Sequence, residues 1–387
     1  MGSSLIIQGH YRRPTGYGCH VREIVRALDK LGIRVQLVDL PTGSQGALPE
    51  EKRDSWFDQL DRAVGSGAIL HICLPHQARI VEGMLNVNWT TFETTRIPET
   101  WAKLSVSQDL VVLPTHSSKR AWMASGISED HLRLCPLAVD SGRFHPGVEP
   151  LKLGRRRGRS VHEYKTRFLN ISDYISAPRK NIFGMLRVWI KTTSANDDAI
   201  LILKLSGYRY RWWRPDRFKR TLSAIEREIG KSRKKAAPVV FYDQVLAESQ
   251  MPSLYAAATH YWSMSYGEGW DFPMMEAGAT GLHLIAPEHS AYNAYLDGSV
   301  AQMIPSQRIP ADFNGGEGFL GALFSGSDWW APDEQAAADF VRQAIKTASN
   351  GLPTARARIA NEFTWEQSAM GLIKILQELY ERHGKKF

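Results

Sequence analysis

Residues 260–287, HYWSMSYGEGWDFPMMEAGATGLHLIAP, contain the pattern that decides the fold. The apolar runs at the two ends of this stretch are typical of buried strands. Glycines between them allow a tight turn, and Pro273 suits the first turn of a helix that begins near Phe272. The stretch therefore predicts a strand, a turn, a helix and a second strand, with Glu268 in the turn and Glu276 in the helix.

The same alternation of strands and helices runs along the whole chain. A strand at 4–9, an amphipathic helix and a strand at 34–40 form a βαβ unit, which implies a parallel sheet. We therefore expect an α/β protein of two doubly wound, Rossmann-like domains that face each other across a cleft, with ligands at the carboxyl ends of the strands. A basic, glycine-rich stretch at 151–160 marks the boundary, so the domains comprise residues 1–155 and 156–387. The C-terminal helices are expected to pack back on the first domain.

Composition narrows the class of protein. The net charge of +8 and the pI near 9.3 favour an anionic partner. Cys19, Cys73 and Cys135 lie far apart, which argues against a disulfide framework and against structural zinc. No apolar run is long enough to span a membrane and the start of the chain does not match a secretory signal, so we expect a cytoplasmic protein.

Two glutamates in the opening stretch are candidates for ligand binding. The amides of Met274 and Met275 would lie in the first turn of the helix, where an anion such as a diphosphate can bind. Glu276 could accept hydrogen bonds from vicinal hydroxyls, and Glu268 could reach another part of the same ligand. Taken singly, Glu268 fits a solvated loop and Glu276 an early-helix acid favoured by the helix dipole. Their joint appearance in this setting favours a binding site.

Four segments resemble one family. EGWDFPMMEAGATGLHLIAP resembles the E-x7-E signature of retaining glycosyltransferases with the GT-B fold, most closely glycosyltransferase family 4. TGYGCHVREIVRALDKLGIRVQLVDL, LRLCPLAVDSGRFHPG and MPSLYAAATHYWSMSYGEG resemble other segments of that family in the same order. Asp271 stands where glycine is usual and His283 where proline is, while Leu137 and Ala138 replace the usual Asn-Gly. Four matches in the right order make the resemblance specific.

The resemblance implies a nucleotide-sugar donor bound mainly by the C-terminal domain and an acceptor bound mainly by the N-terminal domain. Glu276 would hold the ribose hydroxyls, and Glu268 would contact the donor sugar. The first domain would add a glycine loop that closes over the phosphates, although the same residues also fit a plain turn before a helix. The other donor-binding positions implied are Gly269, Phe272, Pro273, Met274 and Met275 in the second domain and Gly16, Tyr17 and Gly18 in the first.

A basic pair is also typical of the family. In NISDYISAPRKNIFGML, Lys180 matches the family lysine and would contact a phosphate oxygen of the leaving group. The family's G-R step is absent, and either Arg179 or Lys204 could supply the missing cation. The alternative is that Arg179 and Lys180 form a solvated helix start.

Glu93 is the candidate from the first domain. It lies in NVNWTTFETTRIPETW, where many family members carry a histidine, and it could orient or deprotonate the acceptor hydroxyl. It could equally cap the following helix together with Thr94 and Thr95.

The stretch GYRYRWWRPDRFKR at 207–220 combines arginines with aromatic residues. Such a mixture suits nucleic acid, but it lies in one loop without a recognisable nucleic-acid module. An acceptor-side patch or a peripheral contact with an anionic membrane surface is preferred. A solvated cationic loop with tryptophans packed beneath it is the alternative.

The sequence thus predicts a retaining glycosyltransferase that moves a hexosyl unit from a nucleotide diphosphate sugar to a glycan or lipid-linked acceptor, in the assembly of cell-envelope polysaccharide, lipopolysaccharide or glycolipid. No cofactor or metal is expected, because helix amides and Lys180 would neutralise the diphosphate and no D-x-D motif lies in a suitable place. The alternatives are a GT-B nucleotide-sugar epimerase or phosphorylase, and a non-catalytic protein that binds a nucleotide sugar or nucleic acid.

Overall fold

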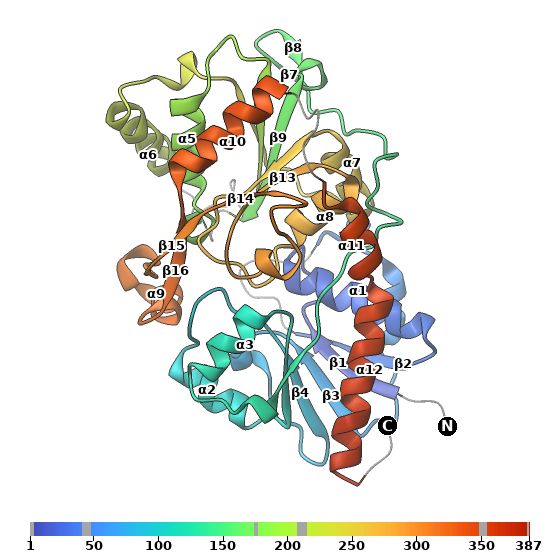
Figure 1. Ribbon diagram of the computed structural model, residues 1–387. Helices are drawn as coiled ribbons and strands as arrows, with labels where there is room; N and C mark the ends of the chain where they lie inside the picture. Colours follow the sequence, from blue (N-terminus) through green and yellow to red (C-terminus); the bar gives the residue numbers. More distant parts are fainter. Residues whose placement is uncertain (1–3, 41–47, 174–176, 207–214, 348–353, 385–386) are drawn as a thin grey trace.

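Two six-stranded parallel sheets, each covered by helices, form the molecule (Figure 1). This arrangement confirms the predicted α/β architecture of two Rossmann-like domains. The computed structural model describes residues 4–40, 48–173, 177–206, 215–347, 354–384 and 387. No helix within these ranges is long and apolar enough to cross a membrane.

The first sheet has the strand order β2-β1-β3-β4-β5-β6. Its strands are β1 (Ser4–Gly9), β2 (Arg34–Asp39), β3 (Ala68–Ile72), β4 (Leu85–Trp89), β5 (Leu110–Leu113) and β6 (Leu132–Leu134). Its helices are α1 (Gly16–Lys30), α2 (Glu99–Val106) and α3 (His116–Met123). Strands β3, β4 and β5 are buried along their whole length, as expected for a parallel sheet that is covered on both faces, and their only polar residues are His71, Asn86 and Asn88.

Helix α1 shows why the first βαβ unit forms. Thr15 caps the helix by accepting a hydrogen bond from the Gly18 amide, which satisfies one of the free amides of the first turn. Val21, Ile24 and Leu28 lie on one stripe and are fully buried against the first sheet.

The second sheet has the strand order β11-β10-β9-β12-β13-β14. Its strands are β9 (Thr166–Asp173), β10 (Ala199–Ser206), β11 (Val239–Tyr242), β12 (His260–Trp262), β13 (His283–Pro287) and β14 (Gln302–Ile304). Its helices are α4 (Ala177–Lys180), α5 (Ile182–Thr192), α6 (Pro215–Glu228), α7 (Met251–Ala256), α8 (Phe272–Thr280) and α10 (Glu334–Thr347). The predicted helix start near Phe272 is confirmed, and β12 ends three residues earlier than predicted.

The basic stretch predicted at the domain boundary folds into a hairpin. Strands β7 (Arg155–Arg156) and β8 (Arg159–Ser160) pair antiparallel. The guanidinium of Arg157 donates to the carbonyl oxygen of Ala236, and Arg159 pairs with Asp198 at 2.8 Å, so the hairpin packs with the second domain. The side chains of this segment are polar because the hairpin lies on the surface at the far end of that domain (Figure 1).

The last two helices return the chain to the first domain. Helix α11 (Arg356–Glu362) packs against α8, and α12 (Trp365–Arg382) packs against α1. The Sγ atom of Cys135, just after the first sheet, lies 3.4 Å from the carbonyl oxygen of Ser368 in α12. Figure 1 shows α12 running along the first domain toward the C-terminus.

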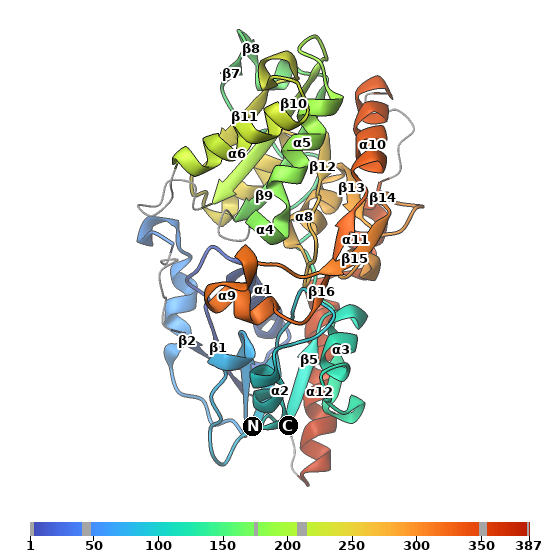
Figure 2. The same ribbon diagram turned by 90° about the vertical axis from the view of Figure 1, so that its left-hand side faces the viewer.

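An arm of the second domain also reaches the first domain. It consists of residues 306–332 and contains β15 (Ser306–Pro310), α9 (Gly318–Phe324) and β16 (Asp328–Pro332). Strands β15 and β16 pair antiparallel, and α9 lies at the level where the two domains meet (Figures 1 and 2). We call this segment the arm.

Candidate active site

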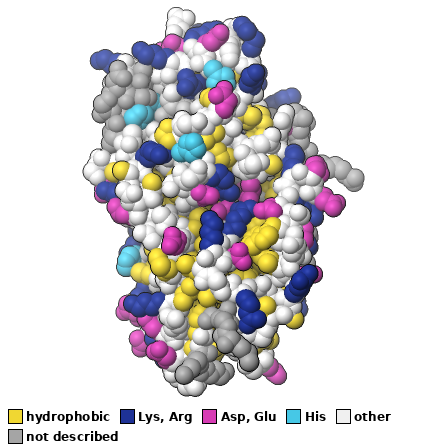
Figure 3. Space-filling view, turned by 90° about the vertical axis from the view of Figure 1, so that its right-hand side faces the viewer, with side chains coloured by type: hydrophobic (Ala, Val, Ile, Leu, Met, Phe, Trp, Pro, Cys, Tyr) yellow, Lys and Arg dark blue, Asp and Glu magenta, His cyan; other side chains and the backbone are white. Residues whose placement is uncertain are grey.

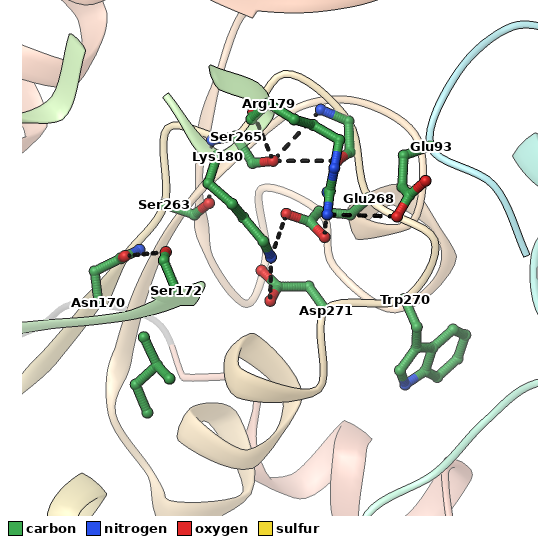
Figure 4. A network of polar contacts seen from close by, with 12 residues as sticks. Glu93, Asn170, Ser172, Arg179, Lys180, Ser263, Ser265, Glu268, Trp270 and Asp271 are labelled. Carbon is green, nitrogen blue, oxygen red and sulfur yellow. Dashed lines mark hydrogen bonds and ion pairs between the residues drawn. The ribbon is translucent and has the colours of Figure 1, made fainter. Parts of the chain in front are cut away.

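A buried cluster of charges lies at the carboxyl ends of the second sheet, where the fold was predicted to bind ligands. Lys180 and Arg179 end the short helix α4 that follows β9, and Glu268 lies in the turn between β12 and α8. The Lys180 Nζ atom is 2.7 Å from Glu268 Oε1, and an Arg179 nitrogen is 3.0 Å from Oε2. Figure 4 shows these side chains pointing toward one another. The Glu268 side chain is only 4% exposed.

The backbone fixes this geometry from both directions. The guanidinium of Arg179 also donates to the carbonyl oxygen of Gly267, while the amide of Tyr266 donates to the carbonyl oxygen of Arg179. The hydroxyl of Ser265 donates to both of these carbonyl oxygens. Helix α4 and the turn are therefore held as one unit, and the solvated helix start considered for Arg179 and Lys180 is not what the chain forms.

The charges in this cluster stabilise one another. Burial by itself raises the pKa of Glu268, but Lys180 and Arg179 outweigh burial and lower that pKa to about 2. Burial lowers the pKa of Lys180 and of Arg179, and the neighbouring carboxylates raise both above their ordinary values. Glu268 is thus ionised and both cations are charged at neutral pH.

Asp271 is a member of the cluster that sequence reasoning missed. Its Oδ2 accepts a hydrogen bond of 2.8 Å from the Tyr292 hydroxyl, and its Oδ1 lies 3.7 Å from Lys180 Nζ. It precedes α8 with a φ of 64°, in the left-handed region where glycine is favoured. Burial raises its pKa to about 6, although Lys180 acts in the opposite direction. The signal in the sequence was the aspartate at a position where the resembling family has glycine.

Glu93 reaches the cluster from the first domain. It lies in the loop after β4, and its Oε1 is 3.4 Å from Arg179. Helix α2 begins only at Glu99, with Pro98 at its N-cap position, so the alternative that Glu93 caps this helix is wrong. Burial raises the pKa of Glu93, while Arg179 lowers it.

The two domains touch at this point. A Cβ atom on Gly267 would collide with the carbonyl oxygen of Glu93, and a Cβ atom on Gly269 would collide with the side chain of Thr91. Glycine is therefore required at both positions because the loop after β4 lies directly on the turn of the second domain. The predicted cleft is occupied here by side chains from both domains.

Glu276 has a different set of neighbours. It lies in the interior of α8, is 8% exposed, and accepts a hydrogen bond of 2.5 Å from the Tyr255 hydroxyl. Burial raises its pKa to about 7, while Tyr255 and Arg143 act in the opposite direction. The Glu268 cluster therefore lies before the start of α8, and Glu276 lies inside the helix with other partners.

The prediction that the amides of Met274 and Met275 are free to bind an anion is wrong. Both donate to the carbonyl oxygen of Asp271, at 3.1 and 3.3 Å, because they close the first turn of α8 itself. Pro273 has no amide hydrogen to offer. The ring of Phe272 stacks on Trp365 at 6.1 Å.

The expected glycine loop of the first domain is part of a helix. Gly16, Tyr17 and Gly18 form the first turn of α1, and Gly18 packs closely against the carbonyl oxygen of Arg13. The Tyr17 hydroxyl lies 3.0 Å from Thr90 Oγ1, beside the loop that carries Glu93. A Cβ atom on Gly16 would lie 3.6 Å from the ring of Phe272, so this turn faces the start of α8.

Lys204 comes from a different strand, β10, which is the neighbour of β9. It lies near the carboxyl end of β10 and is 5% exposed. Burial lowers its pKa to about 8, and Asp243 acts in the opposite direction. Of the two candidates for the missing cation, Arg179 is therefore the one that contacts Glu268.

Two further expectations from the sequence concern the basic aromatic stretch and the absence of a metal. Residues 207–214 of the basic aromatic stretch lie outside the described residues, and the rest of the stretch belongs to the start of α6. Among the residues that the structure describes, no three side chains of His, Cys, Asp or Glu come together as a metal site would require.

Solved structures with the same architecture cover nearly the whole chain. The sucrose-phosphate synthase from Thermosynechococcus elongatus has a TM-score of 0.65 at 15% identity and covers 98% of this chain and 100% of its own. The chain has the GT-B fold. Anabaena HepE in complex with UDP-glucose has a TM-score of 0.66 at 12% identity, with 97% of this chain and 99% of HepE covered.

The lipopolysaccharide outer core galactosyltransferase WaaB has a TM-score of 0.58 at 12% identity and covers 97% of this chain and 99% of its own. No protein-family model matches the chain, and a search of curated proteins finds no match. At these identities the likeness concerns the fold, and membership of glycosyltransferase family 4 stays a prediction.

Proposed function

We propose that this protein is a retaining glycosyltransferase that moves a hexosyl unit from a nucleotide diphosphate sugar to the hydroxyl of a glycan or lipid-linked acceptor. The observation that carries the proposal is the buried contact of Glu268 with Arg179 and Lys180, at the carboxyl ends of the second sheet and opposite Glu93 of the first domain. Charged groups of both signs are buried here at a domain junction, which is where ligand sites of doubly wound folds lie.

Each charged group has a role in the proposed reaction. Arg179 and Lys180 would neutralise the diphosphate as it leaves, because their raised pKa values keep them charged. Glu268 would accept hydrogen bonds from the hydroxyls of the donor sugar, and Glu276 would accept them from the hydroxyls of the ribose. These roles require the donor phosphates to replace part of the present contacts between cations and carboxylates.

The proposed transfer proceeds on one face of the sugar. The bond between the anomeric carbon and the phosphate oxygen breaks, and the acceptor oxygen bonds to the same carbon from the side on which the phosphate leaves. The acceptor proton passes to the leaving phosphate or to Glu93, whose raised pKa favours proton uptake. Closure of the two domains would exclude water and thereby limit hydrolysis of the donor.

The test is the release of nucleoside diphosphate from a panel of UDP, GDP, ADP and dTDP sugars, in buffer with EDTA. The variant Glu276→Ala removes a buried carboxylate of the site, and Glu381→Ala removes an exposed one on α12 as the control. We expect release from one donor by the wild type and by Glu381→Ala, and loss of release in Glu276→Ala.

Other outcomes would overturn parts of the proposal. Absence of release and of thermal stabilisation with every donor would refute donor binding. Loss of release in EDTA, restored by a divalent cation, would refute the expectation from the sequence that no metal is needed. Inversion at the anomeric carbon, read from the product by NMR, would refute retention. Conversion of the sugar without an acceptor, or release that depends on inorganic phosphate, would favour an epimerase or a phosphorylase.

The class of acceptor is the second part of the proposal. The net charge of +8 supports an anionic or lipid-linked glycan of the cell envelope, with a peripheral contact to an anionic membrane. Sedimentation with vesicles that contain anionic lipid, compared with neutral vesicles, measures that contact. Equal recovery with both would argue against it.

A further inference from the structure

The arm makes an aromatic contact with the first domain. The ring of Phe324 in α9 stacks on Phe92 with 5.1 Å between centroids and an interplanar angle of 13°. The ring of Phe313 also stacks on Phe324, with 5.4 Å between centroids, and Trp101 of α2 meets Phe92 edge to face at 4.9 Å. These four side chains are at most 4% exposed and belong to one hydrophobic cluster that spans both domains.

Phe92 immediately precedes Glu93, so the contact with Phe324 anchors one end of the loop at the candidate active site. The arm also anchors the other end. The amide of Asp328 in β16 donates to Thr95 Oγ1 at 3.0 Å, and the amide of Thr95 donates to the carbonyl oxygen of Asp328 at 3.2 Å. The arm therefore grips the chain on both sides of Glu93.

The position of Glu93 follows from this grip. Its carbonyl oxygen lies against Gly267, and the side chain of Trp329 in the arm approaches the same glycine, at 3.3 Å from the position of a Cβ atom there. Its carboxylate lies 3.4 Å from Arg179. The arm thus presents the Glu93 loop to the cation that also holds Glu268.

We propose that the arm is a positioning element, with Thr95 and Phe324 as positioning residues that hold Glu93 against Arg179. Contacts between domains of one chain ordinarily permit relative motion unless they are large and apolar. The aromatic contact and the reciprocal hydrogen bonds make this junction apolar and directional. The effect of the arm on transfer rests on the proposed function, whereas its grip on the loop does not.

A separate contact between the domains provides the control. Arg22 of α1 pairs with Glu248 at 2.5 Å, and Arg26 reaches the same carboxylate at 3.3 Å. Figure 3 shows acidic and basic side chains gathered at the level where the two domains meet. Glu248→Gln weakens this junction without touching the arm or the Glu93 loop.

The experiment is hydrogen exchange, followed by mass spectrometry, of the full chain and four variants. Thr95→Val removes the oxygen that accepts from Asp328 and keeps the shape of the side chain, while Thr95→Ser restores that oxygen. We expect the amides of Asp328 and of 92–97 to exchange about tenfold faster in Thr95→Val, because the Asp328 amide loses its acceptor and the loop loses one of its two hydrogen bonds to the arm. Thr95→Ser and Glu248→Gln should keep the protection of the wild type there.

Phe324→Ala is the fourth variant and changes the arm itself, and the amides of β9 report whether the second domain stays folded. Unchanged protection of 92–97 in Thr95→Val and in Phe324→Ala would overturn the proposed grip. With the donor found in the release assay, Thr95→Val should lower kcat by about tenfold. The donor KM should change little, because the misplaced residue, Glu93, belongs to the first domain and not to the proposed donor site. Thr95→Ser should restore kcat. Faster exchange with unchanged kcat would refute the positioning role alone, and absence of turnover in the wild type would refute the proposed function alone.

Discussion

Replacement of Asp271 by asparagine should stabilise the protein at neutral pH. The Asp271 carboxylate is buried, and burial raises its pKa from 3.8 to about 6 even though Lys180 acts in the opposite direction. Asparagine keeps an oxygen for the Tyr292 hydroxyl and tolerates the left-handed backbone, which the residue adopts with a φ of 64°. The buried negative charge is lost, and the amide NH2 group takes the place of the oxygen that lies 3.7 Å from Lys180.

The magnitude follows from the raised pKa. Two pH units correspond to about 3 kcal/mol, at about 1.4 kcal/mol for each unit. An acid whose pKa is higher in the folded state binds more protons when folded, so its contribution to stability becomes less favourable as pH rises. Between pH 4 and pH 6 the wild type therefore loses up to about 3 kcal/mol through Asp271, and Asp271→Asn does not.

Urea unfolding at several pH values measures this difference directly. The free energy of unfolding of Asp271→Asn minus that of the wild type should be near zero at pH 4 and should rise to at most about 3 kcal/mol at pH 7.5. Asp29→Asn, at an exposed position of α1, is the matched control and should show no such rise. A variant that is less stable than the wild type at pH 7.5, or a difference that does not change with pH, would refute the reasoning.

Three further changes test the rest of the site. Lys180→Met leaves Glu268 with one buried cation instead of two and should lower the free energy of unfolding by about 3–5 kcal/mol, measured by urea unfolding. An unchanged urea midpoint would contradict the buried contact between Lys180 and Glu268. Gly269→Ala drives a Cβ atom into Thr91 and should separate the domains, seen as a larger radius of gyration in X-ray scattering, whereas Gly298→Ala, where no atom lies within 4 Å, should not. The pKa of Glu276 is raised to about 7, so donor binding should tighten by up to about tenfold between pH 6 and pH 8, because the ionised carboxylate accepts hydrogen bonds from the ribose hydroxyls. Titration calorimetry should show donor affinity that does not change with pH in Glu276→Gln. The same lack of pH dependence in the wild type would exclude this role.

Local patterns in the sequence were sufficient for the fold and for half of the site. The strands and the helix within 260–287 are set by short-range periodicity, and the same stretch carries Glu268 and Glu276. The contact between Glu268 and Lys180 could also be expected, because both follow neighbouring strands of a parallel sheet and such strands end at the same edge.

The remaining features depend on how distant parts of the chain meet. The pairing of Glu93 with Arg179 crosses the domain junction and leaves no periodic signal in either segment. In the sequence Asp271 is only a departure from the glycine that is usual at this position. Its role in the cluster could not be predicted, because its partner Tyr292 lies beyond the next strand. The amides of Met274 and Met275 were expected to be free because the pattern predicts a helix start without showing which carbonyl oxygen closes its first turn.

The arrangement of charges indicates which contact a donor would displace first. Glu93, Glu268 and Asp271 face Arg179 and Lys180, so both cations already have carboxylate partners when a diphosphate would arrive. The contact of Lys180 with Asp271 is the longest, at 3.7 Å against 2.7 Å with Glu268. The pKa of Asp271 is also raised to about 6 while that of Glu268 is lowered to about 2, so neutralising Asp271 requires less free energy. In the proposed reaction, Lys180 therefore turns to the phosphate by leaving Asp271, and Glu268 keeps its place beside the donor sugar.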